Sequence, residues 1–78
     1  MDWQNYIHCD PTILVGKPVF KGTRLSVDFI LGLYAVGWPE PQILDSYPTL
    51  TPQALRAMFA FVLDNMREDV FYPMAKAA

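Results

Sequence analysis

An unbroken apolar run at residues 57–63 constrains this chain more than any other feature of its sequence. The run lies within the last helix that the sequence predicts, and a helix that is apolar all round is buried on every side. A chain of 78 residues has too little interior to surround such a helix. We therefore expect two copies to pair through it. The residues predicted at this dimer interface are Met58, Phe59, Phe61 and Val62.

The composition also favours burial against a partner. Apolar residues make up 53% of the chain and charged residues 18%, which is a high apolar share for so small a domain. Cys9 is the single cysteine, so neither an intrachain disulfide nor a paired-cysteine metal site can stabilise the fold. We therefore expect a partner chain to cover the excess apolar surface.

The helix that carries the apolar run has the clearest start in the sequence. Thr51 is a typical N-cap residue and Pro52 suits the first helical position. Leu50 can pack against Leu55 across this start, as in a hydrophobic staple. The helical pattern continues to residue 65 or 66.

Two shorter helices precede it. Ser26 is the predicted cap of the first helix, and Gly37 is its predicted stop. The second helix fits residues 40–46 and must end before Pro48, because a proline disfavours helical backbone at the residue before it. The first helix has apolar residues at helical spacing, namely Val27, Ile30, Leu31 and Tyr34.

The N-terminal third has the pattern of extended backbone. Residues 12–15 and 18–20 are rich in β-branched and aromatic side chains. We expect two short strands that turn at Gly16 and at residues 21–22, with Pro18 on an edge strand. The predicted fold is a single, mainly α domain over residues 1–78. It consists of a β-hairpin region at 7–27, a three-helix core at 27–66 and a C-terminal tail at 67–78.

A basic segment precedes an acidic body, although the net charge of the chain is −2. Between residues 11 and 25 every charged side chain is positive, whereas after Leu25 there are six acidic residues and three basic ones. This asymmetry indicates an anionic partner, with phosphates held by Lys17, Lys21 and Arg24. The alternative is that these three are solvated residues of an edge hairpin, where lysine discourages strand pairing.

The second and third helices have helix-turn-helix proportions. A short helix, a turn at residues 47–50 and a longer helix follow one another. In a DNA-binding pair the start of the second helix enters the major groove, where Gln and Arg contact adenine and guanine edges. Thr51, Gln53 and Arg56 are therefore predicted DNA contacts. Ordinary packing of two helices around a proline turn is the alternative.

The sequence offers little for catalysis or metal binding. His8 is the single histidine, so neither a catalytic triad nor a two-histidine metal site can form within one chain. Asp64 and Glu68 stand four apart on a helical face and are more simply the solvated, acidic end of a helix. We expect no enzymatic activity, no cofactor and no metal. A metal-dependent nuclease fragment is the enzyme alternative.

The sequence shows neither a signal peptide nor a membrane span. Residues 1–10 contain Asp2 and Asp10 but no Lys or Arg, unlike the basic start of a signal peptide. The uncharged stretches at 29–39 and 57–63 are too short or too broken to cross a bilayer. We expect a soluble, cytoplasmic protein.

Two motifs resemble those of one bacterial family. The first is Gly16-Lys17-Pro18-Val19-Phe20-Lys21-Gly22-Thr23-Arg24 and the second is Tyr47-Pro48-Thr49-Leu50-Thr51. At this separation they resemble domain-of-unknown-function family 433, described as VapB-type antitoxin-like proteins. The resemblance covers about residues 7–65.

The resemblance implies a homeodomain-like helix-turn-helix core, preceded by a small β element, in a homodimer. It also implies a partner toxin of the PIN-like ribonuclease kind, which the antitoxin binds while repressing their shared operon. Thr23 and Arg24 match the family's Gly-Thr-Arg, and the predicted contacts at 51, 53 and 56 fall where its last helix begins. This chain departs from the family in having Pro39 where a capping Ser or Thr is usual, and in the bulk of Phe59 and Phe61.

These observations lead to one functional prediction and one competitor. The prediction is a type II antitoxin that dimerises, neutralises a PIN-like toxin and binds operator DNA through its helix-turn-helix. The competitor is a protein–protein interaction module without DNA binding. In the antitoxin, the residues predicted to contact the toxin are Val70, Phe71, Tyr72 and Met74.

Overall fold

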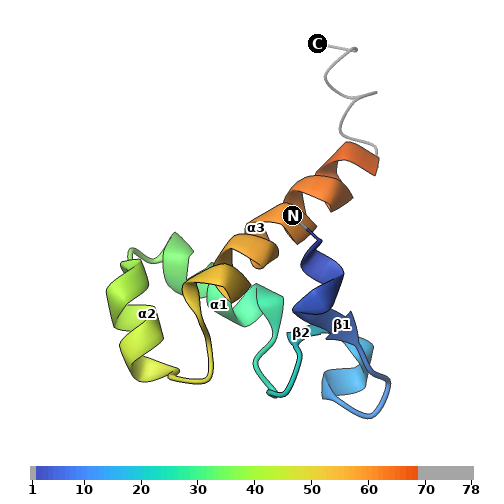
Figure 1. The fold of residues 1–78 in the computed structure, drawn as a ribbon, viewed down its shortest axis with the longest axis horizontal. Helices are drawn as coiled ribbons and strands as arrows, with labels where there is room; N and C mark the ends of the chain where they lie inside the picture. The colour runs from blue at the N-terminus through green and yellow to red at the C-terminus, as the bar shows by residue number, and fades with distance from the viewer. Residues whose placement is uncertain (1, 69–78) are drawn as a thin grey trace.

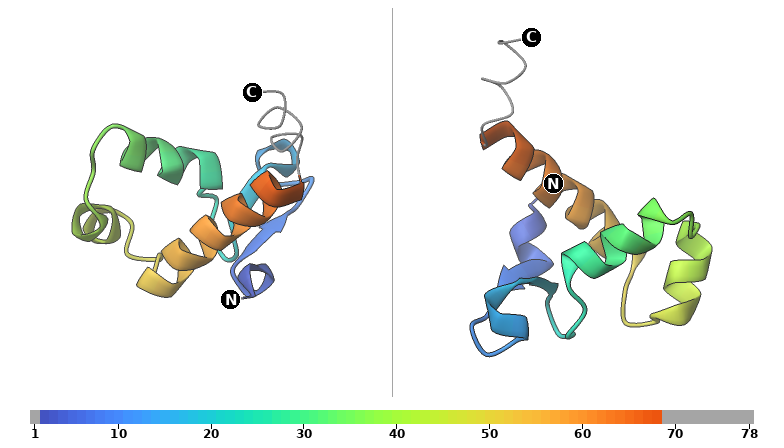
Figure 2. Two further views of the ribbon diagram at one scale, coloured as in Figure 1. Left: turned by 90° about the horizontal axis from the view of Figure 1, so that it is seen from above. Right: turned by 180° about the vertical axis from the view of Figure 1, so that it is seen from behind.

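The computed structural model describes residues 2–68. Three helices and a two-stranded antiparallel hairpin make it a small, mainly helical domain (Figure 1). The third helix lies between the N-terminal segment on one side and the other two helices on the other (Figure 2). The elements in chain order are η1 (Trp3–Asn5), β1 (Ile7–Cys9), η2 (Leu14–Gly16), β2 (Pro18–Phe20), α1 (Val27–Ala35), α2 (Glu40–Ser46) and α3 (Pro52–Glu68).

The first strand does not lie where the sequence predicts it. β1 comprises residues 7–9 and pairs antiparallel with β2, so that Ile7 stands opposite Phe20. Residues 12–15 instead form a turn that ends in η2. The prediction of a strand at 12–15 was therefore wrong, whereas the strand at 18–20 is confirmed.

Local hydrogen bonds override β propensity in this turn. The Asp10 carboxylate accepts from the backbone N–H of Thr12 at 2.9 Å and from its hydroxyl at 2.7 Å, and these bonds lower the pKa of Asp10. Leu14, Val15 and Gly16 have φ values of 50°, 57° and 81°. This left-handed region is costly for residues with side chains. Three such residues in succession reverse the chain, so the β-branched stretch cannot pair as a strand.

Both ends of α1 form as the sequence predicts. The Ser26 hydroxyl oxygen accepts from the backbone N–H of Phe29 at 3.2 Å, which caps the first turn. At the other end Gly37 has a φ of 101°, and the N–H of Trp38 donates to the carbonyl of Leu33 at 2.9 Å. This bond belongs to a Schellman motif, which needs a left-handed residue at the position of Gly37.

The bounds of α2 are confirmed, and those of α3 nearly so. α2 spans Glu40–Ser46, and Pro39 before it makes no side-chain cap. α3 begins at Pro52, where Thr51 Oγ1 accepts from the N–H of Ala54 at 3.1 Å. It extends to Glu68, slightly past the predicted end at residue 65 or 66.

The core joins the hairpin to all three helices. Leu50 and Leu55, the pair predicted to pack across the start of α3, are both buried, at 5% and 0% exposure. The hairpin contributes two side chains, α1 two and α2 one to the same cluster. Its members are Ile7, Phe20, Val27, Ile30, Ile43, Leu50, Ala54, Leu55 and Met58.

The apolar run of α3 is buried on one side of the helix only. Ala57 and Met58 are fully buried, while Phe59 and Leu63 are each 46% exposed. The single chain therefore leaves part of the run exposed, as its small size predicts, and the pairing of two copies through the run stays a prediction. The exposure arises because α3 extends past the body of the domain, where it has neighbours along one side (Figure 1).

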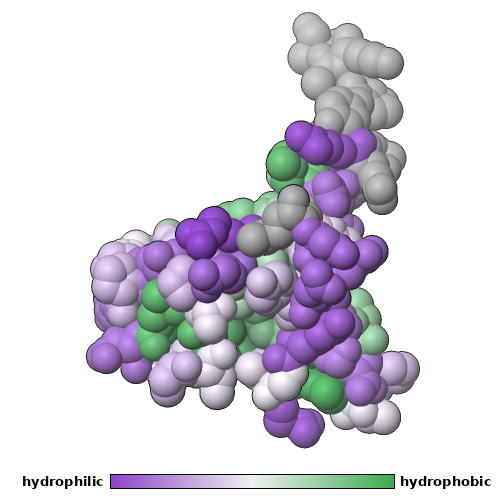
Figure 3. Space-filling view, in the orientation of Figure 1, coloured by the Kyte–Doolittle hydropathy of each residue, from purple (hydrophilic) through white to green (hydrophobic). Residues whose placement is uncertain are grey.

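The surface is uneven in polarity. In Figure 3 hydrophobic side chains gather beside α2, whereas the N-terminal part of the chain is mainly hydrophilic. None of the helices within residues 2–68 has the length and apolar character that crossing a bilayer requires.

Candidate nucleic-acid and partner interfaces

The first two turns of α3 present a polar face. Thr51, Gln53 and Arg56 are all exposed, whereas Ala54 and Leu55 between them are buried and hold the helix on the core. Gln53 and Arg56 are three residues apart, so they are neighbours on the helix surface. The first turn of α3 carries no acidic residue, so the partial positive charge of this helix end is not offset there.

Two of the predicted DNA contacts, Thr23 and Thr51, have hydroxyl groups engaged in the fold. Thr23 Oγ1 donates to the carbonyl of Phe20 at 2.8 Å and accepts from the N–H of Leu25 at 3.0 Å, which closes the turn after β2. Thr51 Oγ1 accepts from the N–H of Ala54. Both threonine hydroxyls thus stabilise the backbone beside the candidate interface. The longer polar side chains of the interface extend from this backbone.

Lys21 and Arg24 are exposed in the turn between β2 and α1. In Figure 1 this turn and the turn from α2 to α3 both reach the lower edge of the molecule, and the rear view in Figure 2 agrees. Within residues 2–67, whose side chains the structure describes, neither cation forms an ion pair. The fold therefore brings two cations of the basic segment to the same edge as the turn that precedes α3.

Lys17, the third predicted phosphate contact, is paired with an acid. Its Nζ lies 3.2 Å from Oδ2 of Asp28 in the first turn of α1, and the two side chains are 59% and 65% exposed. Hydrogen bonds with Ser26 and then with Lys17 hold the pKa of Asp28 below its ordinary value. To contact a phosphate, Lys17 must therefore leave the Asp28 carboxylate.

The residues predicted at the dimer interface have different surroundings. Met58 is fully buried in the chain's own core, so it has no surface to offer a second copy. Phe61 lies edge-on against Trp3, with ring centroids 4.8 Å apart, and is half-buried, as is Val62. Phe59 is 46% exposed and offers the most apolar surface of the four.

An exposed apolar stripe continues along α3 from Phe59. Phe59, Leu63 and Met66 are each 46% exposed. They fall at i, i+4 and i+7, so they share one face of the helix. We call these three residues the α3 stripe. The sequence pattern did not single out Leu63 and Met66, because a run that is apolar all round does not reveal which side the rest of the fold leaves open.

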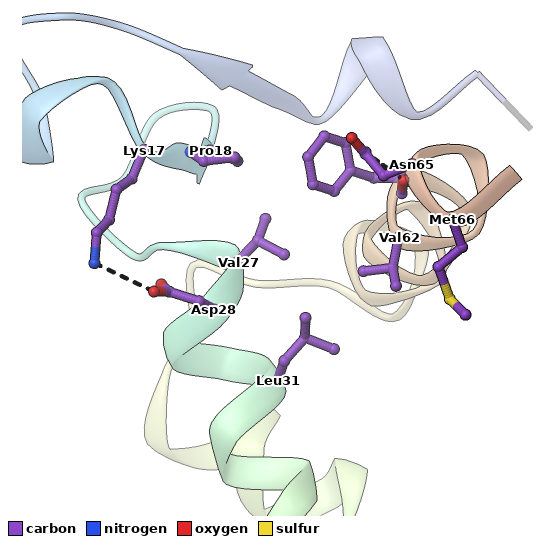
Figure 4. Close-up of a pocket in the computed structure, with 9 residues that line it drawn as sticks. Lys17, Pro18, Val27, Asp28, Leu31, Val62, Asn65 and Met66 are labelled. Atoms are coloured by element: carbon purple, nitrogen blue, oxygen red, sulfur yellow. Dashed lines mark hydrogen bonds and ion pairs between the residues drawn. The ribbon is translucent and has the colours of Figure 1, made fainter. Parts of the chain in front are cut away.

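A groove of about 310 Å³ opens beside this stripe, between the start of α1 and the last turns of α3. Figure 4 shows Val27 and Leu31 of α1 projecting toward α3, with Val62 facing them. Lys17, Asp28 and Asn65 form a polar rim. The sequence pattern did not predict the groove. Its apolar walls come from separate elements and consist of Pro18, Val27, Leu31, Phe61, Val62 and Met66.

The polar residues considered for catalysis are dispersed. Within residues 2–67 no group of three or more His, Cys, Asp and Glu side chains is placed to hold a metal ion. Asp64 accepts a hydrogen bond from Trp3 Nε1 at 2.7 Å, which ties η1 to α3. His8 Nε2 is buried and has no hydrogen-bond partner among the described residues. These residues therefore form no shared site in this part of the chain.

The residues predicted to contact a toxin lie outside the described part of the chain. They are Val70, Phe71, Tyr72 and Met74.

Comparison with known proteins places this chain in a family. A crystal structure of a DUF433 member protein from Anabaena variabilis ATCC 29413 is similar, with a TM-score of 0.76 and 28% sequence identity. The match covers 83% of this chain and 64% of that one, so this chain spans less than two thirds of that relative. No curated protein matches the chain. The family described as "Protein of unknown function (DUF433)" matches residues 7–62, which include both motifs, and the chain belongs to this family.

Proposed function

We propose that this chain is a type II antitoxin that binds operator DNA through α2 and α3 and neutralises a PIN-like ribonuclease toxin. The observation that carries the DNA-binding part is the exposed polar start of α3, where Gln53 and Arg56 share a face directly after the turn from α2. In this proposal α2, the turn and α3 work as a helix-turn-helix, with α3 as the recognition helix.

The first two turns of α3 would read base edges in the major groove. Gln53 suits the N6 and N7 edge of adenine, and Arg56 suits the O6 and N7 edge of guanine, each through two hydrogen bonds. A good pair of this kind discriminates against a wrong base by about 1–3 kcal/mol. The uncompensated positive end of the helix adds attraction for a nearby phosphate.

Phosphate contacts would come from the turn between β2 and α1. Lys21 and Arg24 are exposed there, and contacts of this kind give affinity and register without sequence information. Lys17 would join them only by leaving Asp28 for a phosphate. Each chain then supplies few cations, and a dimer doubles their number on one DNA.

The α3 stripe would pair two copies. Phe59 and Leu63 are large apolar side chains left 46% exposed in the single chain, and pairing removes them from water. The stripe runs from Phe59, near the middle of α3, towards the C-terminal end, while Gln53 and Arg56 lie in the first two turns. Arg56 lies three residues before Phe59 on the same side of the helix, so pairing through the stripe would place Arg56 at the edge of the dimer interface and Gln53 beyond it.

Co-expression with the product of the adjacent gene tests the antitoxin proposal. Restored growth together with a complex that co-purifies would support it. A toxic neighbour that the chain neither binds nor neutralises would contradict it.

Titration with the DNA upstream of the gene tests the DNA-binding part. We expect Gln53→Ala and Arg56→Ala each to weaken binding to this DNA by about 1–3 kcal/mol and to relax the preference over scrambled DNA. Gln4→Ala is the matched control, because Gln4 is exposed on η1, whose Trp3 contacts Phe61 and Asp64 in the later turns of α3. Equal effects of all three changes would contradict the assigned role of α3.

A protein–protein interaction module without DNA binding is the second candidate. The net charge of −2, the pairing of Lys17 with Asp28, and the exposed acids Glu40 and Asp45 on α2 favour it. A stable partner complex, combined with no binding of the upstream DNA by the free chain or the complex at low salt, would decide for this candidate.

A further inference from the structure

The groove between α1 and α3 has walls suited to apolar side chains. Val27 and Leu31 form one wall, and Val62 and Met66 form the other (Figure 4). Met66 is 46% exposed and lies near the end of α3. The apolar surface of the groove therefore continues to the point where the described part of the chain ends.

We propose that residues 70–74 of this same chain fold back from the end of α3 and cover the groove. Four of these five residues carry large apolar side chains, namely Val70, Phe71, Tyr72 and Met74. The fifth is Pro73, which disfavours helical backbone at Tyr72 before it. The segment thus has the apolar content that the groove takes.

The position of the segment along the chain suits the groove. Met66 is a wall residue and precedes Val70 by four positions. Three to five extended residues span roughly 10–18 Å, and one helical turn rises only about 5.4 Å. The chain after Glu68 is therefore long enough to return along the last turn of α3 to the groove.

Tethering favours this chain's own segment over the same segment of a second copy. A short flexible connection holds its two ends at an effective concentration on the order of millimolar. A second copy competes only when the protein itself reaches a comparable concentration. Phe59 and Leu63 of the α3 stripe lie outside the groove lining, so a covered groove leaves them available for pairing.

The inference concerns the isolated chain and stands whether or not the antitoxin proposal does. If both hold, the residues that contact a toxin first leave the groove, and toxin binding competes with this intrachain contact.

Paired cysteines in the full chain test the contact. In a Cys9→Ser background, Leu31→Cys is combined with Phe71→Cys and the protein is mildly oxidised. We expect an intrachain disulfide in most molecules, with a yield that does not change on tenfold dilution. The control combines Phe71→Cys with Gln42→Cys, an exposed position on α2 at the other end of the molecule from the end of α3 (Figure 1), and should give less than a tenth of that yield. Equal intrachain yields in the two pairs, or disulfide-linked dimers, would overturn the proposal.

A second measurement needs only one cysteine in the groove. The thiol introduced by Leu31→Cys is labelled with a water-soluble disulfide reagent, in chains with the native segment or with Phe71→Ser and Tyr72→Ser together. We expect labelling to be at least fivefold faster in the serine variant, with no change for a thiol introduced by Gln42→Cys. Equal labelling rates at the groove thiol would overturn the proposal.

Discussion

The ammonium group of Lys17 lies 3.2 Å from the carboxylate of Asp28 and ties the segment before β2 to the first turn of α1. Both side chains are more than half exposed, so water and salt screen the pair. Such exposed pairs contribute about 0.2–1 kcal/mol. The pair is therefore weak enough for Lys17 to leave Asp28 and bind a phosphate. While the pair is formed, Lys17 is not available to bind DNA.

Under the proposed function, Asp28→Asn should strengthen DNA binding, because it releases Lys17. We expect a gain of about 0.2–1 kcal/mol per protomer, the size of an exposed ion pair. Fluorescence anisotropy with the upstream DNA measures it. Asp45→Asn is the control, since it removes an exposed acid from α2 and changes the net charge equally. Equal gains from both changes would show that net charge, and not the release of Lys17, is responsible.

Asp28→Asn should also lower the stability of the fold at neutral pH and have no effect on it in strong acid. Hydrogen bonds with Ser26 and Lys17 hold the pKa of Asp28 below 3.8 in the folded state. A lowered folded pKa means stability that is present above pH 3.8 and is lost as the pH falls through the folded pKa. We expect Asp28→Asn to cost under about 1 kcal/mol at neutral pH. Urea unfolding at several pH values checks this, and a difference that persists undiminished in strong acid would contradict it.

Val15→Asn should stabilise the chain. Val15 has a φ of 57° and is 96% exposed, so its side chain strains the backbone and packs on almost nothing. Asparagine tolerates the left-handed region better, and the expected gain is about 0.5–1 kcal/mol of the roughly 1–2 kcal/mol that this conformation costs. Val36→Asn is the matched control, since Val36 is 75% exposed with a φ of −91°. Thermal unfolding that shows equal shifts for the two variants would contradict the role of backbone strain.

The starts of α1 and α3 were predictable because their signals are local. The hydroxyls of Ser26 and Thr51 accept from N–H groups three residues further along the chain, so the sequence alone contains both partners. The turn before β2 is different. There the Asp10 side chain competes with the β propensity of residues 12–15, and the sequence does not show which of the two dominates.

The groove and the α3 stripe depend on how the helices are placed. The apolar pattern of α3 is visible in the sequence, but its open side is set by contacts with η1, β1 and the other helices. Val27 and Leu31 line the groove from α1, far from Val62 in the sequence. No periodicity within one helix indicates such a pairing. The roles of Gln53, Arg56 and the cations in binding DNA stay predictions.

Leu63→Glu should disrupt the proposed dimer. Leu63 is 46% exposed in the centre of the α3 stripe and does not line the groove. Pairing would bury two glutamates against each other, and like charges brought together cost several kcal/mol in an interface. Sedimentation equilibrium should therefore show monomers for this variant and dimers for Gln53→Glu, the control in the exposed first turn of the same helix. A monomeric native chain, or a Leu63→Glu dimer of unchanged affinity, would contradict pairing through the stripe.

The salt dependence of DNA binding should report the number of phosphate contacts. If Lys21 and Arg24 hold phosphates, a dimer makes four such contacts, and log K should fall with log salt with a slope of about −3.6. If Lys17 in both chains leaves Asp28 for a phosphate, the contacts rise to six and the slope steepens to about −5.4. Lys21→Ala should flatten the slope by about 2, whereas Arg56→Ala should reduce sequence preference and leave the slope nearly unchanged, because Arg56 is assigned to a base edge. A native slope near zero would remove the electrostatic basis of the DNA-binding proposal and favour the interaction module, whose apolar contacts on α3 depend little on salt.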